Sequence, residues 1–189
     1  MKKLKTIAIA LLIVLGTTVS VAQNKKINIE NSKITWLAKK TGGQHEGTIN
    51  FTSGTLVFKK KALKGGSFVV DMNSINTTDL ESGKGREDLN GHLKSPDFFG
   101  VEKFPTSKIE FKTISGKGKG LYTVTADLTI KDITEPVTFD ITVTGKTATT
   151  SFKVDRTKYG IKYKSKSVFS DLGDKFIYDD FDLTIKLEF

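Results

Sequence analysis

The sequence predicts an all-β fold, and three features of the chain support that prediction. Apolar and polar residues alternate along several segments, turn residues separate those segments, and only one stretch carries helical signals. The alternation is clearest at residues 122–131, 137–143 and 181–189. Because successive side chains of a strand point to opposite faces of a sheet, each segment is a strand with one buried and one solvated face.

Shorter alternating segments complete the strand pattern. They lie at residues 34–38, 49–51, 56–58, 68–72, 109–111 and 152–154. Glycine-containing turns are predicted between the strand patterns, at residues 42–43, 53–54, 65–66, 116–120 and 145. Eight or nine strands with such short connections favour antiparallel neighbours. A closed barrel would remove the exposed sheet edges, and a two-sheet sandwich fits the alternation equally well.

One stretch, residues 78–100, interrupts the strands. Leu89 and Leu93 are four apart and can share one helical face. Ser95 resembles a helix N-cap because a proline and an aspartate follow it, at positions that suit the first helical turn. We therefore expect one or two short helices inserted between strands.

The chain divides into a leader and a single domain. Residues 1–22 have a lysine-containing start, a short apolar run and small residues before Gln23, which is typical of a secretory signal peptide. Residues 23–189 are enough for one domain with a core. There is no cysteine, which excludes disulfides, thiol catalysis and thiolate metal sites. We expect an exported protein, periplasmic or secreted.

The distribution of charge indicates which classes of binding partner are expected. Without the three lysines of the leader, the formal net charge of +9 falls to +6. The lysines are scattered through strands and hairpins, whereas a nucleic-acid surface would cluster them among stacking aromatics. We therefore expect no nucleic-acid partner. The sequence leaves transient contact with a membrane surface and a homodimer open.

Catalytic and cofactor motifs are missing from the sequence. His45 and His92 are the only histidines, and neither lies in a recognisable catalytic or zinc-binding pattern. The glycine–lysine stretches lack the spacing of a phosphate-binding loop. We predict no enzyme activity, no metal site and no cofactor, although a lipid-modifying enzyme with a histidine base stays a minor alternative.

The aromatic residues raise the question of what fills the interior. Thirteen Phe, four Tyr and one Trp occur, mostly on the apolar faces of predicted strands. An eight-stranded barrel is just wide enough to be filled by side chains or to hold one small ligand. The rings therefore either pack a closed core or line an apolar cavity. In the first case the protein would be a secreted structural or stress-response interaction protein.

Five motifs resemble the YceI-like family of exported bacterial proteins, and together they span the predicted domain. They read "GGQHEGTI", "GHLKSPDFF", "ADLTIKDITEPVTF", "VDRTKYGI" and "DDFDLTIKLEF". The resemblance implies an extended, eight-stranded antiparallel, lipocalin-like barrel with a short inserted helical segment. It also implies non-enzymatic binding, sequestration or transport of a long apolar amphiphile, such as a polyisoprenoid or related lipid, inside that barrel.

A set of apolar residues is expected to form the lipid-binding bore and its mouth. Phe98 and Phe99, in the helical interruption, would line or cap the bore, one anchoring the helix and the other reaching inward. The full set is Trp36, Phe51, Phe58, Phe68, Phe98, Phe99, Phe111, Tyr122, Leu128, Phe139, Ile141 and Phe152.

Overall fold

The computed structural model of the chain describes residues 21–189 except 170, 172 and 174. The predicted signal peptide, residues 1–22, therefore lies almost entirely outside the described residues. The elements are β1 (Gln23–Lys26), β2 (Lys33–Lys40), β3 (Gly43–Lys59), β4 (Ala62–Thr77), α1 (Arg86–Lys94), β5 (Thr106–Gly118), β6 (Leu121–Ile130), β7 (Ile133–Thr144), β8 (Thr147–Asp155), the 3-10 helix η1 (Arg156–Tyr159) and β9 (Ile177–Glu188).

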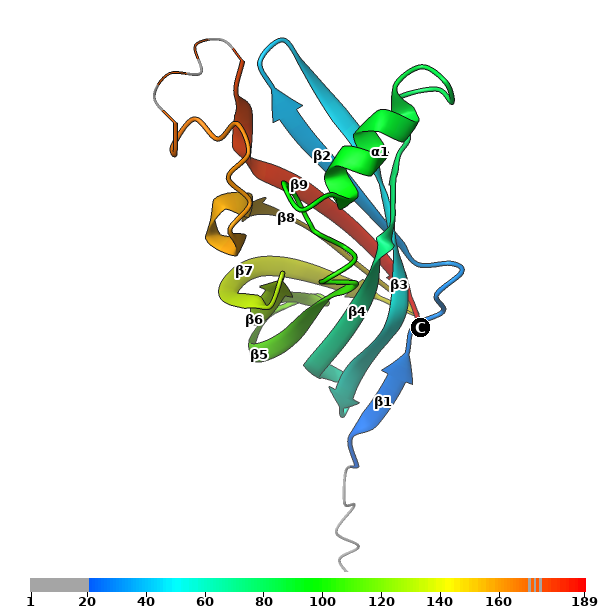
Figure 1. The fold of residues 1–189 in the computed structure, drawn as a ribbon. Coiled ribbons are helices and arrows are strands. Elements are labelled where there is room, and N and C mark those ends of the chain that lie inside the picture. The colour runs from blue at the N-terminus through cyan, green and yellow to red at the C-terminus, as the bar shows by residue number, and fades with distance from the viewer. Residues whose placement is uncertain (1–20, 170, 172, 174) are drawn as a thin grey trace, which may run out of the picture.

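The strands form one antiparallel sheet that closes on itself (Figure 1). The strand order is β1-β3-β2-β9-β8-β7-β6-β5-β4, and β3 also pairs with β4. Strands β2 to β9 therefore make a closed eight-stranded barrel, which confirms the predicted fold and excludes the two-sheet sandwich. The long strand β3 pairs with β2 along its first half and with the short strand β1 near its end.

The two ends of the barrel differ (Figure 1). We call the end that carries α1, the β2–β3 turn and the β8–β9 connection the upper end, and the end with the β3–β4 turn the lower end. Leu56 and Leu63, beside the β3–β4 turn, are almost fully buried, and Phe58 stacks on Phe189 with ring centroids 5.4 Å apart. The lower end is therefore filled by its own side chains.

The predicted turns at residues 53–54 and 65–66 are wrong, because Gly54, Gly65 and Gly66 lie inside strands. The β3–β4 turn is instead Lys60-Lys61, both in the left-handed region at φ 50° and 66°. The strand glycines have a packing role. A Cβ atom on Gly54 would lie only 2.5 Å from the ring of Phe68 on the next strand, so glycine makes room for an aromatic ring here rather than reversing the chain.

The helical interruption is present, but its boundary was predicted in the wrong place. Ser95 ends α1 rather than starting a helix: its N–H bonds to the carbonyl of Gly91, and its hydroxyl donates to the carbonyl of His92 at 2.8 Å. The segment that follows forms turns. The backbone N–H of Phe98 bonds back to the Ser95 carbonyl at 3.1 Å, which folds the two phenylalanines under the helix.

Strands β7 and β8 separate toward the upper end. They pair only at residues 141–144 and 147–150, so the first half of β7 pairs with β6 alone. Pro136 lies in that half, where the missing N–H costs no hydrogen bond to β8. The 3-10 helix η1 contacts β7 here, and its residue Tyr159 is 1% exposed. The gap between the two strands is thus covered by η1.

Candidate functional site: an apolar cavity in the barrel

A cavity of about 170 Å³ lies inside the barrel, and all eight barrel strands contribute to its wall. Its lining is mainly aliphatic and aromatic. The polar residues among the lining are Ser107, Lys108, Thr150, Arg156 and Tyr178; no histidine or carboxylate is among the described residues that line it. A space of this character suits an uncharged, apolar group.

Ten of the twelve predicted bore residues line this cavity. Phe58 and Tyr122 do not. Phe58 belongs to the stacked pair at the lower end, and the Tyr122 hydroxyl accepts the N–H of Leu63 at 3.3 Å. Both side chains point inward, as alternation predicted, but at the level where the barrel is filled. Alternation gives the face of a strand and says nothing about where along the barrel the cavity stops.

Several lining residues were missed by the sequence reasoning. Ten of the apolar ones comprise four from β9, three from β4, two from β2 and one from α1: Phe181, Leu183, Ile185, Leu187, Val70, Met72, Ile75, Ile34, Ala38 and Leu93. The signal was present for β9, because its four residues share the apolar face of the most regular alternating segment. Strand β9 therefore forms one long side of the cavity.

Five phenylalanine rings form a belt around the cavity wall. The centroid distances along the belt are 6.0, 5.7, 5.8 and 4.6 Å, in the order Phe51, Phe68, Phe111, Phe139 and Phe152. Strand β6 contributes no ring, because the small, fully buried Ala126 lies opposite Phe111. The rings on β5 and β7 therefore meet across it. Contacts of this kind stabilise by about 0.5–1.5 kcal/mol beyond area burial.

Glycines on neighbouring strands allow some rings to lie flat against the wall. A Cβ atom on Gly66 would lie 2.6 Å from the ring of Phe111, and one on Gly47 would lie 2.4 Å from the ring of Trp36. The Trp36 indole also donates to the carbonyl of Thr48 at 3.3 Å. Because these rings cover strand backbone instead of projecting inward, the middle of the barrel stays open.

Arg156 is the buried cation of the cavity wall, only 4% exposed. Its Nε donates to the carbonyl of Tyr178 at 3.1 Å, and its two Nη atoms donate to the carbonyls of Ile161 and Ile177, each at 3.0 Å. Burial lowers the pKa of Arg156, and Asp179, 3.5 Å away, opposes that effect. The guanidinium thus donates hydrogen bonds to protein carbonyls and links η1 to β9.

Asp179 completes this tie. Burial alone would raise the pKa of its carboxyl, but the hydroxyls of Ser165 and Ser167 and the charge of Arg156 hold that pKa below its usual value. At the other side of η1, Asp155 caps the short helix by accepting the N–H of Thr157 at 2.9 Å. The arginine of the "VDRTKYGI" motif is therefore part of the scaffold at the upper end.

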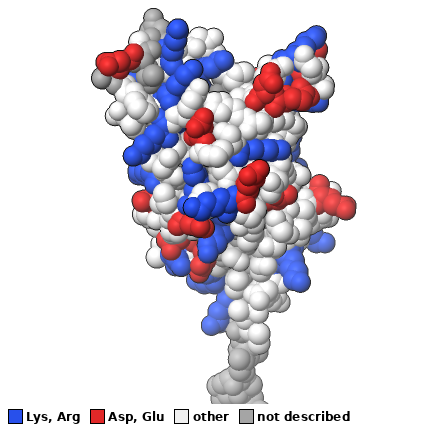
Figure 2. Space-filling model, viewed as in Figure 1, with Lys and Arg blue, Asp and Glu red and all other residues white. Residues whose placement is uncertain are grey.

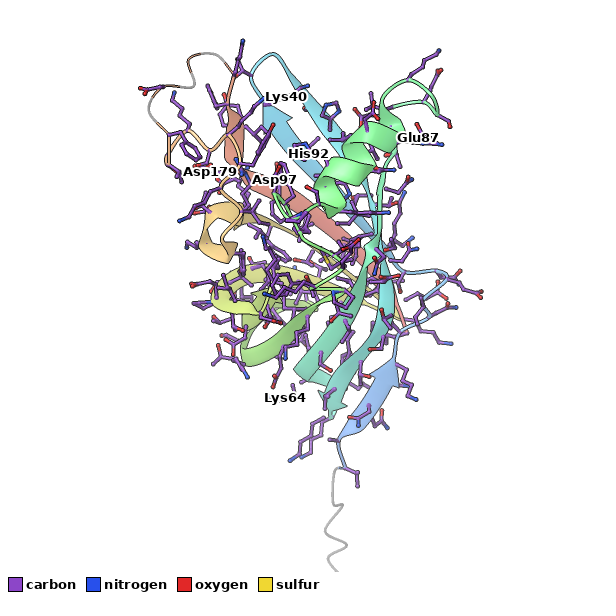
Figure 3. The ribbon with its side chains drawn as sticks, viewed as in Figure 1. Lys40, Lys64, Glu87, His92, Asp97 and Asp179 are labelled. Carbon is purple, nitrogen blue, oxygen red and sulfur yellow. The ribbon has the colours of Figure 1, made fainter. Side chains whose placement is uncertain are left out.

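Phe98 lies where three elements of the upper end meet. Its ring contacts His92 of α1 at 4.9 Å and Tyr163 of the β8–β9 connection at 5.5 Å. Its carbonyl accepts from Lys131 of the β6–β7 turn at 2.8 Å. Phe98 is buried and Phe99 half-buried, and both line the cavity. We call α1 and the turns after it, residues 86–104, the covering segment. Figure 3 shows His92 and Asp97 of this segment above the interior of the barrel.

Neither histidine lines the cavity. The His45 Nδ1 lies 2.8 Å from a carboxylate oxygen of Asp79, whose other oxygen accepts the N–H of Glu46. His92 lies 3.6 Å from Asp97 on the surface of the covering segment. The part of the chain that the structure describes has no group of three or more metal-ligating side chains. Within that part, no helix is long and apolar enough to cross a membrane.

A family model described as the YceI-like domain matches residues 26–189, the whole barrel. The chain belongs to the YceI-like family. Among curated relatives, a UPF0312 protein of Shewanella denitrificans is 32% identical over 100 residues, and one of Yersinia enterocolitica is 31% identical over 102. Each alignment covers 53% of this chain, and the chain spans about half the length of these relatives, 50% and 49%.

Solved structures share the fold of this YceI-like chain at low sequence identity. BcnA of Burkholderia cenocepacia superposes with a TM-score of 0.68 at 20% identity, over 85% of this chain and 98% of BcnA. A polyisoprenoid binding domain from Saccharophagus degradans, implicated in plant cell wall breakdown, gives a TM-score of 0.59 at 12% identity, over 86% of this chain and 95% of that domain. These matches show that the barrel is a YceI-like barrel.

Proposed function

We propose that this protein binds a long apolar amphiphile, a polyisoprenoid or related lipid, in the barrel cavity and sequesters or transports it without chemical change. The cavity carries the proposal: it is apolar over nearly all of its lining, and its buried cation is bonded to protein carbonyls. The related domain from Saccharophagus degradans, described as polyisoprenoid binding, supports this choice of ligand class.

The driving force for binding is the removal of apolar surface from water. A ligand segment that buries on the order of 300 Å² gains about 7–8 kcal/mol at 25 cal/mol per Å². Part of that gain is offset by the lost freedom of the two molecules. No ion pair is needed for useful affinity, which fits a wall whose buried charge, Arg156, is already bonded to protein carbonyls.

The size of the cavity limits how much ligand it holds at once. One water-sized group needs on the order of 10–15 Å³ of such space, so about 170 Å³ takes roughly ten or more chain carbons. That is about two isoprene units. A longer chain would extend past the covering segment at the upper end, or displace it.

The two alternatives fit less well. A barrel completely filled by its own side chains does not account for the open middle of this one. A lipid-modifying enzyme would need a base near the ligand, and both histidines lie away from the cavity. We further propose that residues 1–22 direct export, which N-terminal sequencing of the mature protein tests.

Lipid extraction tests the proposal directly. Protein purified from its own host without detergent is expected to show, in native mass spectrometry, a mass beyond that of the polypeptide, and organic extraction should release an apolar lipid. Leu183→Trp, which fills the cavity from β9, should abolish this adduct, whereas Phe58→Leu at the filled lower end should keep it. A wild-type protein with no extractable lipid and a dense interior at high resolution would contradict the proposal.

A further inference from the structure

The connection between β8 and β9, together with the start of β9, exposes large side chains beside the upper end of the cavity. Val168 is 42% exposed, Phe169 48% and Tyr178 51%. These are three of the six large exposed hydrophobic residues in the part of the chain that the structure describes. Val168 and Phe169 are adjacent in the chain, and an exposed apolar patch of this kind marks a contact site for a partner or a membrane.

The same connection is basic. Residues 157–169 contain Lys158, Lys162, Lys164 and Lys166 and no acidic residue. Two aspartates follow before residue 175, which is a fifth lysine, so the connection keeps a net positive charge. Figure 2 shows blue side chains over this region, which is orange in Figure 1.

The hairpin between β2 and β3 lies against this region. The N–H of Thr41 donates to the carbonyl of Phe176 at 3.1 Å, and Lys40 pairs in register with Ile177. The ammonium of Lys166 lies 4.8 Å from the ring centroid of Phe176. Lysines from two strand connections therefore lie at the start of β9, beside Phe176 and Ile177.

The base of this region is held firmly and leads into the cavity. Ser165 is fully buried, and the N–H of Ile177 donates to the carbonyl of Lys164 at 2.9 Å. Tyr178 contacts Phe176 with centroids 5.1 Å apart, and both Tyr178 and Ile177 line the cavity. Tyr178, which is half-exposed and also lines the cavity, thus connects this surface with the cavity wall.

We propose that this surface docks on an anionic lipid bilayer. Its basic-aromatic patch comprises Lys40, Lys164, Lys166, Val168, Phe169 and Tyr178. Val168 and Phe169 enter the interfacial region, and the three lysines face the lipid phosphates. Aromatic side chains favour this depth of the membrane, and lysines near an anionic surface add long-range attraction. The patch places the upper end of the cavity at the bilayer surface.

Vesicle binding tests the patch without any cavity ligand. The outcome for the membrane-docking proposal is therefore independent of whether the protein carries a lipid. We expect the protein to float with phosphatidylcholine vesicles that contain roughly one third phosphatidylglycerol, and binding to weaken as salt rises. Vesicles of phosphatidylcholine alone should bind far less.

Two variants separate the basic from the apolar part of the patch. Lys164→Glu/Lys166→Glu should weaken binding by about 25-fold or more, because each lysine near such a surface contributes roughly fivefold. Val168→Ser/Phe169→Ser should weaken it by about three- to tenfold or more, since Phe169 alone offers about half a ring to the membrane.

The matched control is Lys26→Glu/Lys64→Glu, which changes the net charge equally at the lower end (Figures 1 and 3). It should bind nearly as the wild type does. Equal loss in the control and patch variants would show that only net charge matters and would overturn the patch. Binding to soluble polyanions but not to vesicles, or self-association through the patch with no vesicle binding, would overturn it as well.

Discussion

Replacing Phe98 and Phe99 separately by alanine distinguishes a packed plug from a ligand-binding cover. Phe98 is as buried as Phe58, each 8% exposed, while Phe99 is half-buried. Phe98 and Phe99 line the cavity, and Phe58 does not. Phe58→Ala is therefore a matched control that removes an equally buried ring far from the proposed ligand.

The expected losses of stability follow from these environments. Truncating a packed phenylalanine costs ~3–5 kcal/mol, and Phe98→Ala should fall near 3 because one side of the ring already faces open space. At about 2–4 °C per kcal/mol for a domain of this size, the melting temperature should fall by about 6–12 °C. Phe58→Ala should lose at least as much, and Phe99→Ala about 1–2 kcal/mol because its ring is half-exposed.

The assay is thermal melting of lipid-stripped protein with and without added long-chain isoprenoid. Ligand at 100 times its dissociation constant stabilises the wild type by ~2.7 kcal/mol. Phe58→Ala should keep this shift, whereas Phe98→Ala and Phe99→Ala should bind about five- to tenfold more weakly, because the ligand loses an apolar partner. If the ligand shifts all three variants as it shifts the wild type, the two phenylalanines only plug the barrel.

Three further predictions concern the scaffold. Arg156→Met should cost ~3–5 kcal/mol of unfolding free energy in urea melts, because three carbonyls and the Asp179 carboxylate lose their donor. The double variant Arg156→Met/Asp179→Asn should recover part of the loss. Full stability of the single variant would refute the role of Arg156 in linking η1 to β9. Burial raises the pKa of Tyr159 to about 12. The stability that this shift contributes is complete below the pKa of the unfolded state, near 10, and is lost between about pH 10 and 12. Tyr159→Phe should therefore unfold at a higher pH than the wild type, and an unchanged midpoint of alkaline unfolding would contradict this. Gly66→Ala should cost ~1–3 kcal/mol, since its Cβ forces the Phe111 ring to move, and a neutral result would show that the ring yields freely.

The alternation of apolar residues was enough to predict the strands, but the choice of a barrel over a two-sheet sandwich came from the resemblance to the YceI-like family. Each barrel strand contains at least one predicted alternating segment, because the two faces of a half-buried strand appear in sequence as alternating apolar and polar residues. Strand β3 is the exception in its extent, since it was predicted as two segments, 49–51 and 56–58, and is one strand. The glycine rule failed at Gly54 and Gly66 for a reason outside the local sequence. Each lies beside a ring on a neighbouring strand, Phe68 and Phe111 respectively, and register between strands cannot be read from one strand alone.

The covering segment shows the same limit. Ser95, followed by a proline and an aspartate, has the composition of an N-cap, yet its hydrogen bonds are those of a helix end. The segment after it is held by Lys131 and Tyr163, both from distant parts of the chain. The role of Arg156 was likewise invisible in sequence, since its three acceptors are carbonyls of residues that are ordinary in themselves.

The two ends of the barrel also differ in what it takes to open them. At the lower end, Leu56 and Leu63 lie within paired strands and are almost fully buried, so a path there would break the β3–β4 ladder and expose the core. At the upper end, the contacts between the covering segment and the β8–β9 connection are ring edges, such as His92 against Tyr163 at 4.6 Å. Side-chain contacts of this kind separate at far lower cost than a strand ladder. A ligand chain should therefore enter from the upper end, beside the exposed basic and aromatic residues.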